Sequence, residues 1–195
     1  MIIRKAEFIT SAVESEQYPD LNSLDIAFFG RSNVGKSSLI NSLTCRKSLA
    51  KHGKTPGVTA LVNFFNINDE FYFVDLPGYG YAQTAKAERD NWERIINTYL
   101  TGRKQLKLAI IIVDIRHKPN NNDCLMYDWI RYNEVPNIVV ASKKDKIKRS
   151  QIKKNTDEIR NTLGVPQNIS ILPVSSLDKT GIDELWNLIE GMLLR

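Results

Sequence analysis

Residues 30–38 read GRSNVGKSS and follow directly on the apolar run IAFF. The spacing G-x-x-x-x-G-K-S is that of a phosphate-binding loop, in which backbone N–H groups point inward at phosphate oxygens. Such a loop lies between a strand and a helix. The run at residues 26–29 is typical of a buried strand, and SSLINSLT at residues 37–44 has apolar residues at helical spacing. The sequence therefore predicts a nucleoside triphosphate site.

Each residue type in this loop has a chemical reason. Gly30 and Gly35 allow backbone conformations and close approaches that a side chain forbids. Lys36 would reach the β- and γ-phosphates, and the Ser37 hydroxyl would bind Mg²⁺. The helix that begins near Lys36 would direct its positive end at the phosphates. The predicted nucleotide contacts of this loop are Gly30, Arg31, Ser32, Asn33, Val34, Gly35, Lys36 and Ser37.

The composition suits one globular domain: the chain has 195 residues, of which 42% are hydrophobic and 25% are charged. No apolar run is long enough to span a membrane, and the first ten residues lack a signal-peptide core, so we expect a cytoplasmic protein. Cys45 and Cys124 are expected to be reduced core residues. The net charge of +5 permits an anionic partner such as RNA, although a solvated basic surface also accounts for it.

Strand-like and helix-like segments alternate along the rest of the chain. NFFNI and FYFVDL, joined at Asn68 and Asp69, predict a hairpin. The apolar runs at residues 106–115, 136–142 and 168–176 predict further strands, and the amphipathic segments between and after them predict helices. We therefore expect an α/β fold with a mostly parallel six-stranded sheet, one antiparallel strand, and helices on both faces.

Ligands of such a sheet bind at the carboxyl ends of its strands, where two further motifs lie. DLPG at residues 75–78 comes first: its carboxylate can hold a Mg²⁺-bound water, and its glycine N–H can meet a γ-phosphate. The predicted contacts from this motif are Asp75, Leu76, Pro77 and Gly78.

SKKD at residues 142–145 predicts which base is bound. The Asp145 carboxylate can accept hydrogen bonds from N1–H and the N2 amine of guanine, donors that adenine does not offer in this arrangement. The Lys143 stem would lie over the base, and a backbone N–H near Ser175 would meet the guanine O6. A hydroxyl from the loop at residues 45–62 could complete the Mg²⁺ site, but spacing alone does not distinguish Thr59 from Thr55 or from a solvated threonine.

The motifs GRSNVGKSS, PGVT, DLPG, SKKD and VSS, in this order, resemble those of a Ras-like GTPase domain. SAVESEQYP, GRSNVGKSSLINSL, VDLPGYGYA and the tryptophan-bearing segment that follows are similar to the EngB family of bacterial GTP-binding proteins, over essentially the whole chain. The resemblance implies a three-layer Ras-like P-loop GTPase fold. It also implies an N-terminal extension, residues 1–22, packed on a GTP-binding domain at residues 23–195.

The same resemblance implies a GTPase switch that binds GTP and GDP with Mg²⁺ and is needed for large (50S) ribosomal subunit assembly, cell division and septation. It assigns Mg²⁺ to Ser37 and Thr59, although the family often has Lys-Thr where this chain has Val58-Thr59. The base motif usually begins with Asn or Thr, where this chain has Ser142. The further site residues that it implies are Gly57, Val58, Thr59, Ala60, Leu61, Ser142, Lys143, Lys144, Asp145, Val174, Ser175 and Ser176.

Turnover is expected to be slow, because Tyr79 stands where Ras has a glutamine that orients water, and Gln83 is not at that position. In related GTPases an asparagine at the position of Asn33 helps to hold K⁺ beside the phosphates; a local turn contact is the alternative. The predicted catalytic residues are Lys36, Thr59, Gly78 and Asn33.

Two questions of function stay open in the sequence. A small-molecule kinase would use the same phosphate loop, but it would not explain SKKD, and the chain has no obvious lid over an acceptor. We expect a monomer whose partner is a ribosomal subunit precursor or its rRNA. The basic residues beyond SKKD either contact rRNA phosphates or form a solvated helix start, namely Lys146, Lys148, Arg149, Lys153 and Lys154.

Overall fold

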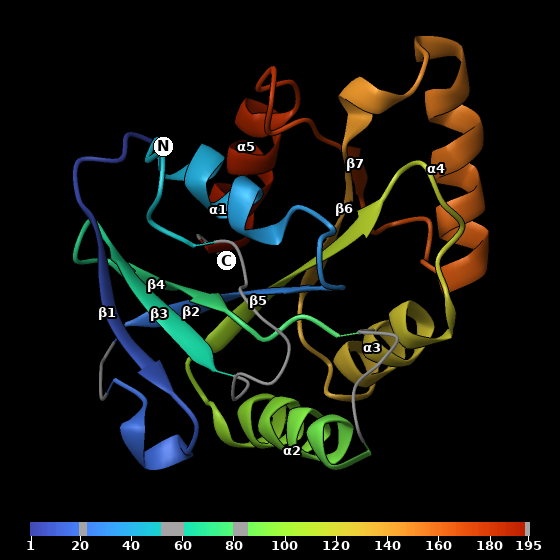
Figure 1. Ribbon diagram of the computed structural model, residues 1–195. Coiled ribbons are helices and arrows are strands. Elements are labelled where there is room, and N and C mark those ends of the chain that lie inside the picture. Colours follow the sequence, from blue (N-terminus) through green and yellow to red (C-terminus); the bar gives the residue numbers. More distant parts are fainter. Residues whose placement is uncertain (20–22, 52–60, 80–85, 194–195) are drawn as a thin grey trace.

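The computed structural model describes residues 1–19, 23–51, 61–79 and 86–193 (Figure 1). Its centre is a seven-stranded sheet in the order β1-β3-β4-β2-β5-β6-β7. The strands are β1 (Ala6–Ala12), β2 (Leu24–Gly30), β3 (Val62–Ile67), β4 (Phe71–Asp75), β5 (Leu106–Asp114), β6 (Asn137–Ser142) and β7 (Ile171–Pro173). The helices are η1 (Ser15–Gln17), α1 (Lys36–Leu43), α2 (Lys86–Gly102), α3 (Asn121–Tyr132), η2 (Lys144–Lys146), α4 (Arg149–Leu163) and α5 (Ile182–Leu193).

The strand directions confirm the predicted α/β class. β3 runs antiparallel to its neighbours β1 and β4, whereas the other neighbouring pairs are parallel. The predicted hairpin is also confirmed, because Asn68 and Asp69 join β3 to β4 with φ angles of 56° and 59°. Positive φ at both central residues matches the right-handed twist of the two strands.

The sheet has seven strands rather than the six expected. The additional strand is β1, which pairs with β3 at the edge of the sheet, with a register irregularity between Phe8 and Thr10. Its segment, AEFITSA, is half exposed, so it lacks the continuous apolar run by which the central strands were found. Because β1 covers the outer edge of β3, backbone groups of β3 that would otherwise lack a partner are hydrogen-bonded.

Helices cover both faces of the sheet, which confirms the three layers. α1 and α5 lie on one face, and α2, α3 and α4 lie on the other (Figure 1). Successive residues of β2 show why: Ile26 and Phe28 pack with the first group of helices, and Ala27 and Phe29 pack with the second. Side chains alternate across a strand, so a strand buried on both faces needs a continuous apolar run.

In the described residues, no helix is long and apolar enough to cross a membrane.

Buried polar contacts connect the start of β2 to the N-terminal segment. The Asp25 carboxylate is fully buried and lies 2.8 Å from Arg103 Nε, and the Tyr99 hydroxyl donates to it at 2.9 Å. The Arg103 guanidinium also lies over the rings of Tyr18 and Phe64.

The boundary expected at residue 22 stays a prediction, since residues 20–22 lie outside the described part.

The cysteines differ from the expectation of two core residues. Both are free, but Cys45 is exposed directly after the C-cap of α1, where its φ is 53°. Cys124 is half-buried in α3, and its thiol lies 3.5 Å from the carbonyl of Thr162. The expectation of a core residue is therefore wrong for Cys45, which lies beyond the end of α1 and is exposed there.

Candidate functional site

The phosphate loop connects β2 to α1, and its two glycines are required by its geometry. A Cβ on Gly30 would lie 2.8 Å from Val34 Cγ1 and 2.9 Å from the carbonyl oxygen of Ile112 on β5. Gly35 has a φ of +104°, a conformation that residues with a side chain rarely adopt. Gly35 is also the N-cap of α1, so the helix starts at Lys36 as predicted.

DLPG lies against this loop because β4 is the parallel neighbour of β2. The Lys36 ammonium forms an ion pair with the Asp75 carboxylate, and both side chains are about nine-tenths buried. A Cβ on Gly78 would lie 3.0 Å from the backbone nitrogen of Ser32. The structure therefore brings together Lys36, Asp75 and Gly78, which the sequence placed at one site.

The residues present fit a magnesium ion. The Ser37 hydroxyl donates to the Lys51 carbonyl at 3.2 Å, and the Asp75 carboxylate is paired with Lys36, the residue before Ser37. Mg²⁺ commonly takes one or two protein oxygens and completes its six ligands with phosphate and water. Within the described ranges there is no group of three His, Cys, Asp or Glu side chains that could hold a metal alone. The predicted site residues Gly57, Val58, Thr59 and Ala60 lie outside the described residues.

The base motif places a carboxylate beside the last strand. The Ser175 hydroxyl donates to Asp145 Oδ1 at 2.9 Å and itself accepts from the backbone nitrogens of Leu177 and Asp178. Asp145 Oδ2 is buried and accepts no hydrogen bond from the described part of the chain, although the exposed Lys146 ammonium lies 3.3 Å away. Burial raises the pKa of Asp145, but the Ser175 hydroxyl and Lys146 outweigh burial and hold that pKa below its usual value.

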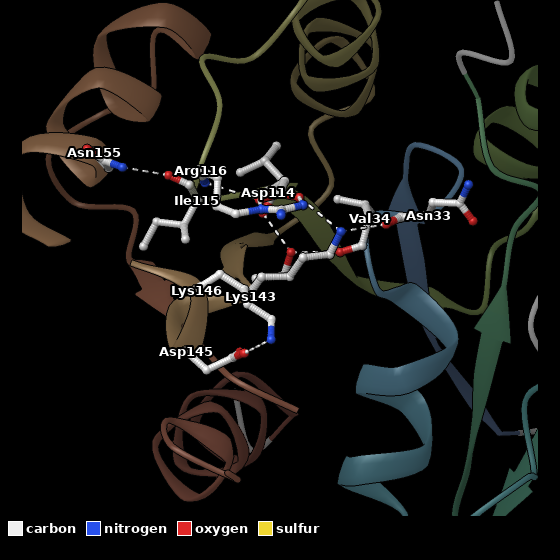
Figure 2. Close-up of polar contacts among 11 residues, drawn as sticks. Asn33, Val34, Asp114, Ile115, Arg116, Lys143, Asp145, Lys146 and Asn155 are labelled. Carbon is white, nitrogen blue, oxygen red and sulfur yellow. Dashed lines mark hydrogen bonds and ion pairs between the residues drawn. The ribbon is translucent and has the colours of Figure 1, made fainter. Parts of the chain in front are cut away.

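The base motif is bonded directly to the phosphate loop, as Figure 2 shows. The Ser142 hydroxyl lies 2.7 Å from the carbonyl oxygen of Val34, so the serine at this position bonds the base motif to the phosphate loop. The Lys143 ammonium donates to the carbonyl oxygen of Asn33 at 2.7 Å. Lys144, the next residue, donates its backbone N–H to the Val174 carbonyl and so connects the two segments that are predicted to contact the base.

Asp114 completes this connection and was missed from the sequence. Its carboxylate is 5% exposed, and it lies 2.9 Å from the Lys143 ammonium and 2.8 Å from Arg116 Nη2 (Figure 2). Burial raises the pKa of Asp114, but the hydrogen bonds from Arg116 and Lys143 outweigh burial and lower it strongly. The sequence does contain a signal for it, because Asp114 is the last residue of β5, just as Asp75 is the last residue of β4.

Several predicted residues have side chains directed elsewhere. Leu76 is buried in the core, and Arg31 forms an ion pair with Asp123 on α3. The Tyr79 side chain is 4% exposed, and its hydroxyl donates to Asp123 at 3.0 Å. Two further predicted residues lie at the edge of the site. The backbone carbonyl of Ser176 accepts a hydrogen bond from the Ser42 hydroxyl, and Leu61 directly precedes β3.

Together, this sheet topology, glycine loop, DLPG and base motif define a P-loop GTPase of the Ras-like class. A model of the 50S ribosome-binding GTPase family matches residues 25–143, and a model of the elongation factor Tu GTP-binding domain matches residues 94–194. A relative from Clostridium beijerinckii, described as a probable GTP-binding protein EngB, is 56% identical and covers 95% of this chain and 93% of its own. Another EngB protein, from Clostridium acetobutylicum, is 53% identical over 97% of this chain and 94% of its own.

Solved structures agree with these sequence comparisons. The crystal structure of a probable GTP-binding protein EngB superimposes with a TM-score of 0.72 at 27% identity, over 88% of this chain and all of that one. A variant of Era from Aquifex aeolicus, solved with GDP·AlF4⁻, superimposes with a TM-score of 0.65 at 25% identity, over 86% of this chain and 56% of that chain. The chain belongs to the EngB family of GTP-binding proteins, and it is a GTPase.

The hydrogen bond from Ser175 generates a prediction. Ser175→Ala removes the donor to Asp145, so we expect the affinity for GDP to fall about fivefold, the effect of one hydrogen bond of average net strength. The pKa of Asp145 should rise toward its usual value, so the acid limb of GDP binding should move to higher pH. Calorimetric titration between about pH 3 and 7, a range that includes the usual pKa of an aspartate, would measure both effects, with the exposed Ser170→Ala as control. An unchanged acid limb would contradict the assigned role of Ser175.

Proposed function

We propose that this chain is a slow GTPase and a GTP-dependent switch in the assembly of the large (50S) ribosomal subunit, and through it in cell division and septation. The observation that carries the proposal is the direct bonding of the base motif to the phosphate loop through Ser142 and Lys143. One nucleotide can therefore be held at both ends by a single structural unit. The match to the 50S ribosome-binding GTPase family supports the ribosomal part.

In this proposal residues 30–37 surround the phosphates, and Lys36 leaves Asp75 for the β- and γ-phosphates when GTP binds. Ser37 and Thr59 hold Mg²⁺, which neutralises developing charge on the phosphates when bound. Gly78 directs its N–H at the γ-phosphate, and residues 57–61 and 75–77 contribute the other contacts on this side. Asp145 accepts the guanine N1–H and N2 amine, and residues 142–144 and 174–176 enclose the base.

Slow turnover follows from the position of Tyr79. Its side chain is buried and its hydroxyl is bonded to Asp123, so this residue cannot orient an attacking water beside Gly78. We propose that K⁺ or a ribosomal partner supplies the missing stabilisation, with Asn33 as a ligand of the ion. Asn33 suits this role because it is exposed at the tip of the phosphate loop, where its φ is 64°.

The K⁺ proposal predicts the salt dependence of turnover. GTP hydrolysis should be at least tenfold faster in KCl than in NaCl at equal ionic strength, since a K⁺ ion held by Asn33 would supply positive charge beside the phosphates. Asn33→Ala should remove the difference, and Asn168→Ala, an exposed asparagine far along the chain, should keep it. Phosphate release measured in both salts tests this, and equal rates for the unaltered chain would contradict it.

Base specificity is tested by Asp145→Asn. The amide can donate to the O2 of xanthine but cannot accept both guanine donors, so affinity for GTP should fall about 30- to 100-fold while affinity for xanthosine triphosphate rises. Competition of both nucleotides against a fluorescent GDP analogue would measure the change in preference. If the chain were instead a small-molecule kinase with the same loop, the substitution would not change the preference between the two nucleotides. An equal loss of affinity for both would therefore contradict the role of Asp145 in guanine recognition.

The ribosomal proposal predicts nucleotide-dependent binding. The exposed residues Lys148 and Lys153 belong to the basic set on η2 and α4, which we propose contacts rRNA phosphates in the cytoplasm while the chain acts as a monomer. Sedimentation with purified ribosomal subunits should show more bound chain with a GTP analogue than with GDP. Binding should weaken steeply between 50 and 200 mM salt, as counterion release requires. Equal binding with both nucleotides would contradict the switch.

A further inference from the structure

We propose that Asp123 is a positioning residue that holds Gly78 against the phosphate loop and thereby sets the preference of this site for GTP over GDP. The inference rests on the proposed contact between the Gly78 N–H and the γ-phosphate. Asp123 does not touch the nucleotide in this account. It acts through Tyr79, the residue directly after Gly78.

Asp123 is a fully buried carboxylate with three partners from three parts of the chain. The Tyr79 hydroxyl donates to its Oδ1 at 3.0 Å. The backbone N–H of Asn120 donates to its Oδ2 at 2.9 Å, and Arg31 Nε of the phosphate loop lies 3.1 Å from the same oxygen. A buried carboxylate without partners costs several kcal/mol, so moving any of these groups away from Asp123 is unfavourable. The carboxylate therefore holds its three partners in place.

The backbone of Tyr79 is held as firmly as its side chain. The Ser32 N–H of the phosphate loop donates to the Tyr79 carbonyl at 3.0 Å, and Arg31 and Tyr79 form a parallel bridge. Gly78 is in close contact with Ser32, because a Cβ at Gly78 would lie 3.0 to 3.2 Å from its atoms. Asp123 therefore ties the phosphate loop, through Arg31, and the end of DLPG, through Tyr79, to the same carboxyl group.

A tryptophan of α2 fixes the other side of DLPG. Trp92 Nε1 donates to the carbonyl of Pro77 at 2.8 Å, and its ring contacts the Tyr79 ring edge-on at 5.6 Å between centroids. Trp92 in turn stacks on Trp129 of α3 with an angle of 7° between the rings. Residues 77–79 are thus held by α2, by α3 and by the phosphate loop.

These contacts affect the two nucleotides differently. GDP has no γ-phosphate, so its binding does not use the Gly78 N–H, whereas GTP binding requires that N–H to be in place. A chain in which residues 77–79 are already ordered binds GTP without a further loss of conformational freedom. Weakening the contact to Asp123 should therefore lower the affinity for GTP and leave that for GDP nearly unchanged.

The alternative is that Asp123 only caps α3, since its backbone N–H and the Asn120 side chain complete a capping box. Tyr79→Phe separates the two roles, because it removes the hydroxyl and leaves the cap intact. The matched control is Tyr99→Phe, which also removes a buried hydroxyl that donates to a buried carboxylate, Asp25, at 2.9 Å. That carboxylate lies at the start of β2, at the opposite end of the strand from the phosphate loop.

The experiment measures affinities for GDP and for a non-hydrolysable GTP analogue by calorimetry, together with thermal stability. Tyr79→Phe should lower the affinity for the analogue about fivefold relative to GDP, equivalent to one hydrogen bond. Tyr99→Phe should leave this ratio unchanged even though it destabilises the fold. Trp92→Phe, which removes the donor to Pro77, should shift the ratio in the same direction as Tyr79→Phe.

A Tyr79→Phe chain that keeps the ratio of the unaltered chain, within twofold, overturns the role of Asp123 while the proposed function stands. If the unaltered chain binds neither guanine nucleotide, the proposed function fails and this inference fails with it. If Tyr99→Phe shifts the ratio as much as Tyr79→Phe does, the effect is general loss of stability and the positioning role is overturned.

Discussion

The candidate site depends most on the two contacts that the Lys143 ammonium makes. It lies between the carbonyl of Asn33 in the phosphate loop and the buried carboxylate of Asp114 at the end of β5. Because Lys143 belongs to the base motif, this contact fixes the base motif against the phosphate loop. Arg116 also binds Asp114, with two hydrogen bonds from its guanidinium and one from its backbone N–H, and these fix the orientation of the carboxylate toward Lys143.

A second buried carboxylate holds the other side of the same loop. Asp123 is paired with Arg31, two residues before Asn33, so the phosphate loop is bonded to Asp114 on one side through lysine and to Asp123 on the other. Buried ion pairs contribute little net stability compared with apolar packing, but removing one partner is strongly unfavourable. Such contacts therefore suit a site whose geometry matters more than its contribution to stability.

Most of the fold could be predicted from the sequence because its main signals are local. The continuous apolar runs of β2, β5 and β6 and the glycine spacing of residues 30–35 were sufficient for the parallel sheet and the loop. β1 was missed because its pairing with β3 joins residues far apart in the chain, and its own pattern is half exposed. Asp123 was missed for a related reason, because its contacts with Arg31 and Tyr79 appear only when distant segments are brought together.

Tyr79 connects the rate of the reaction to the architecture. A glutamine at this position orients water in Ras, and its side chain must then face the nucleotide. Here the hydroxyl is bonded to Asp123 of α3, and Trp92 of α2 contacts the ring. In our proposal this contact positions the backbone of Gly78 for GTP, and it also directs the side chain away from the place where it could orient an attacking water. The proposed switch depends on this arrangement, because a site without a water-orienting side chain at this position needs a group from outside the chain to complete it.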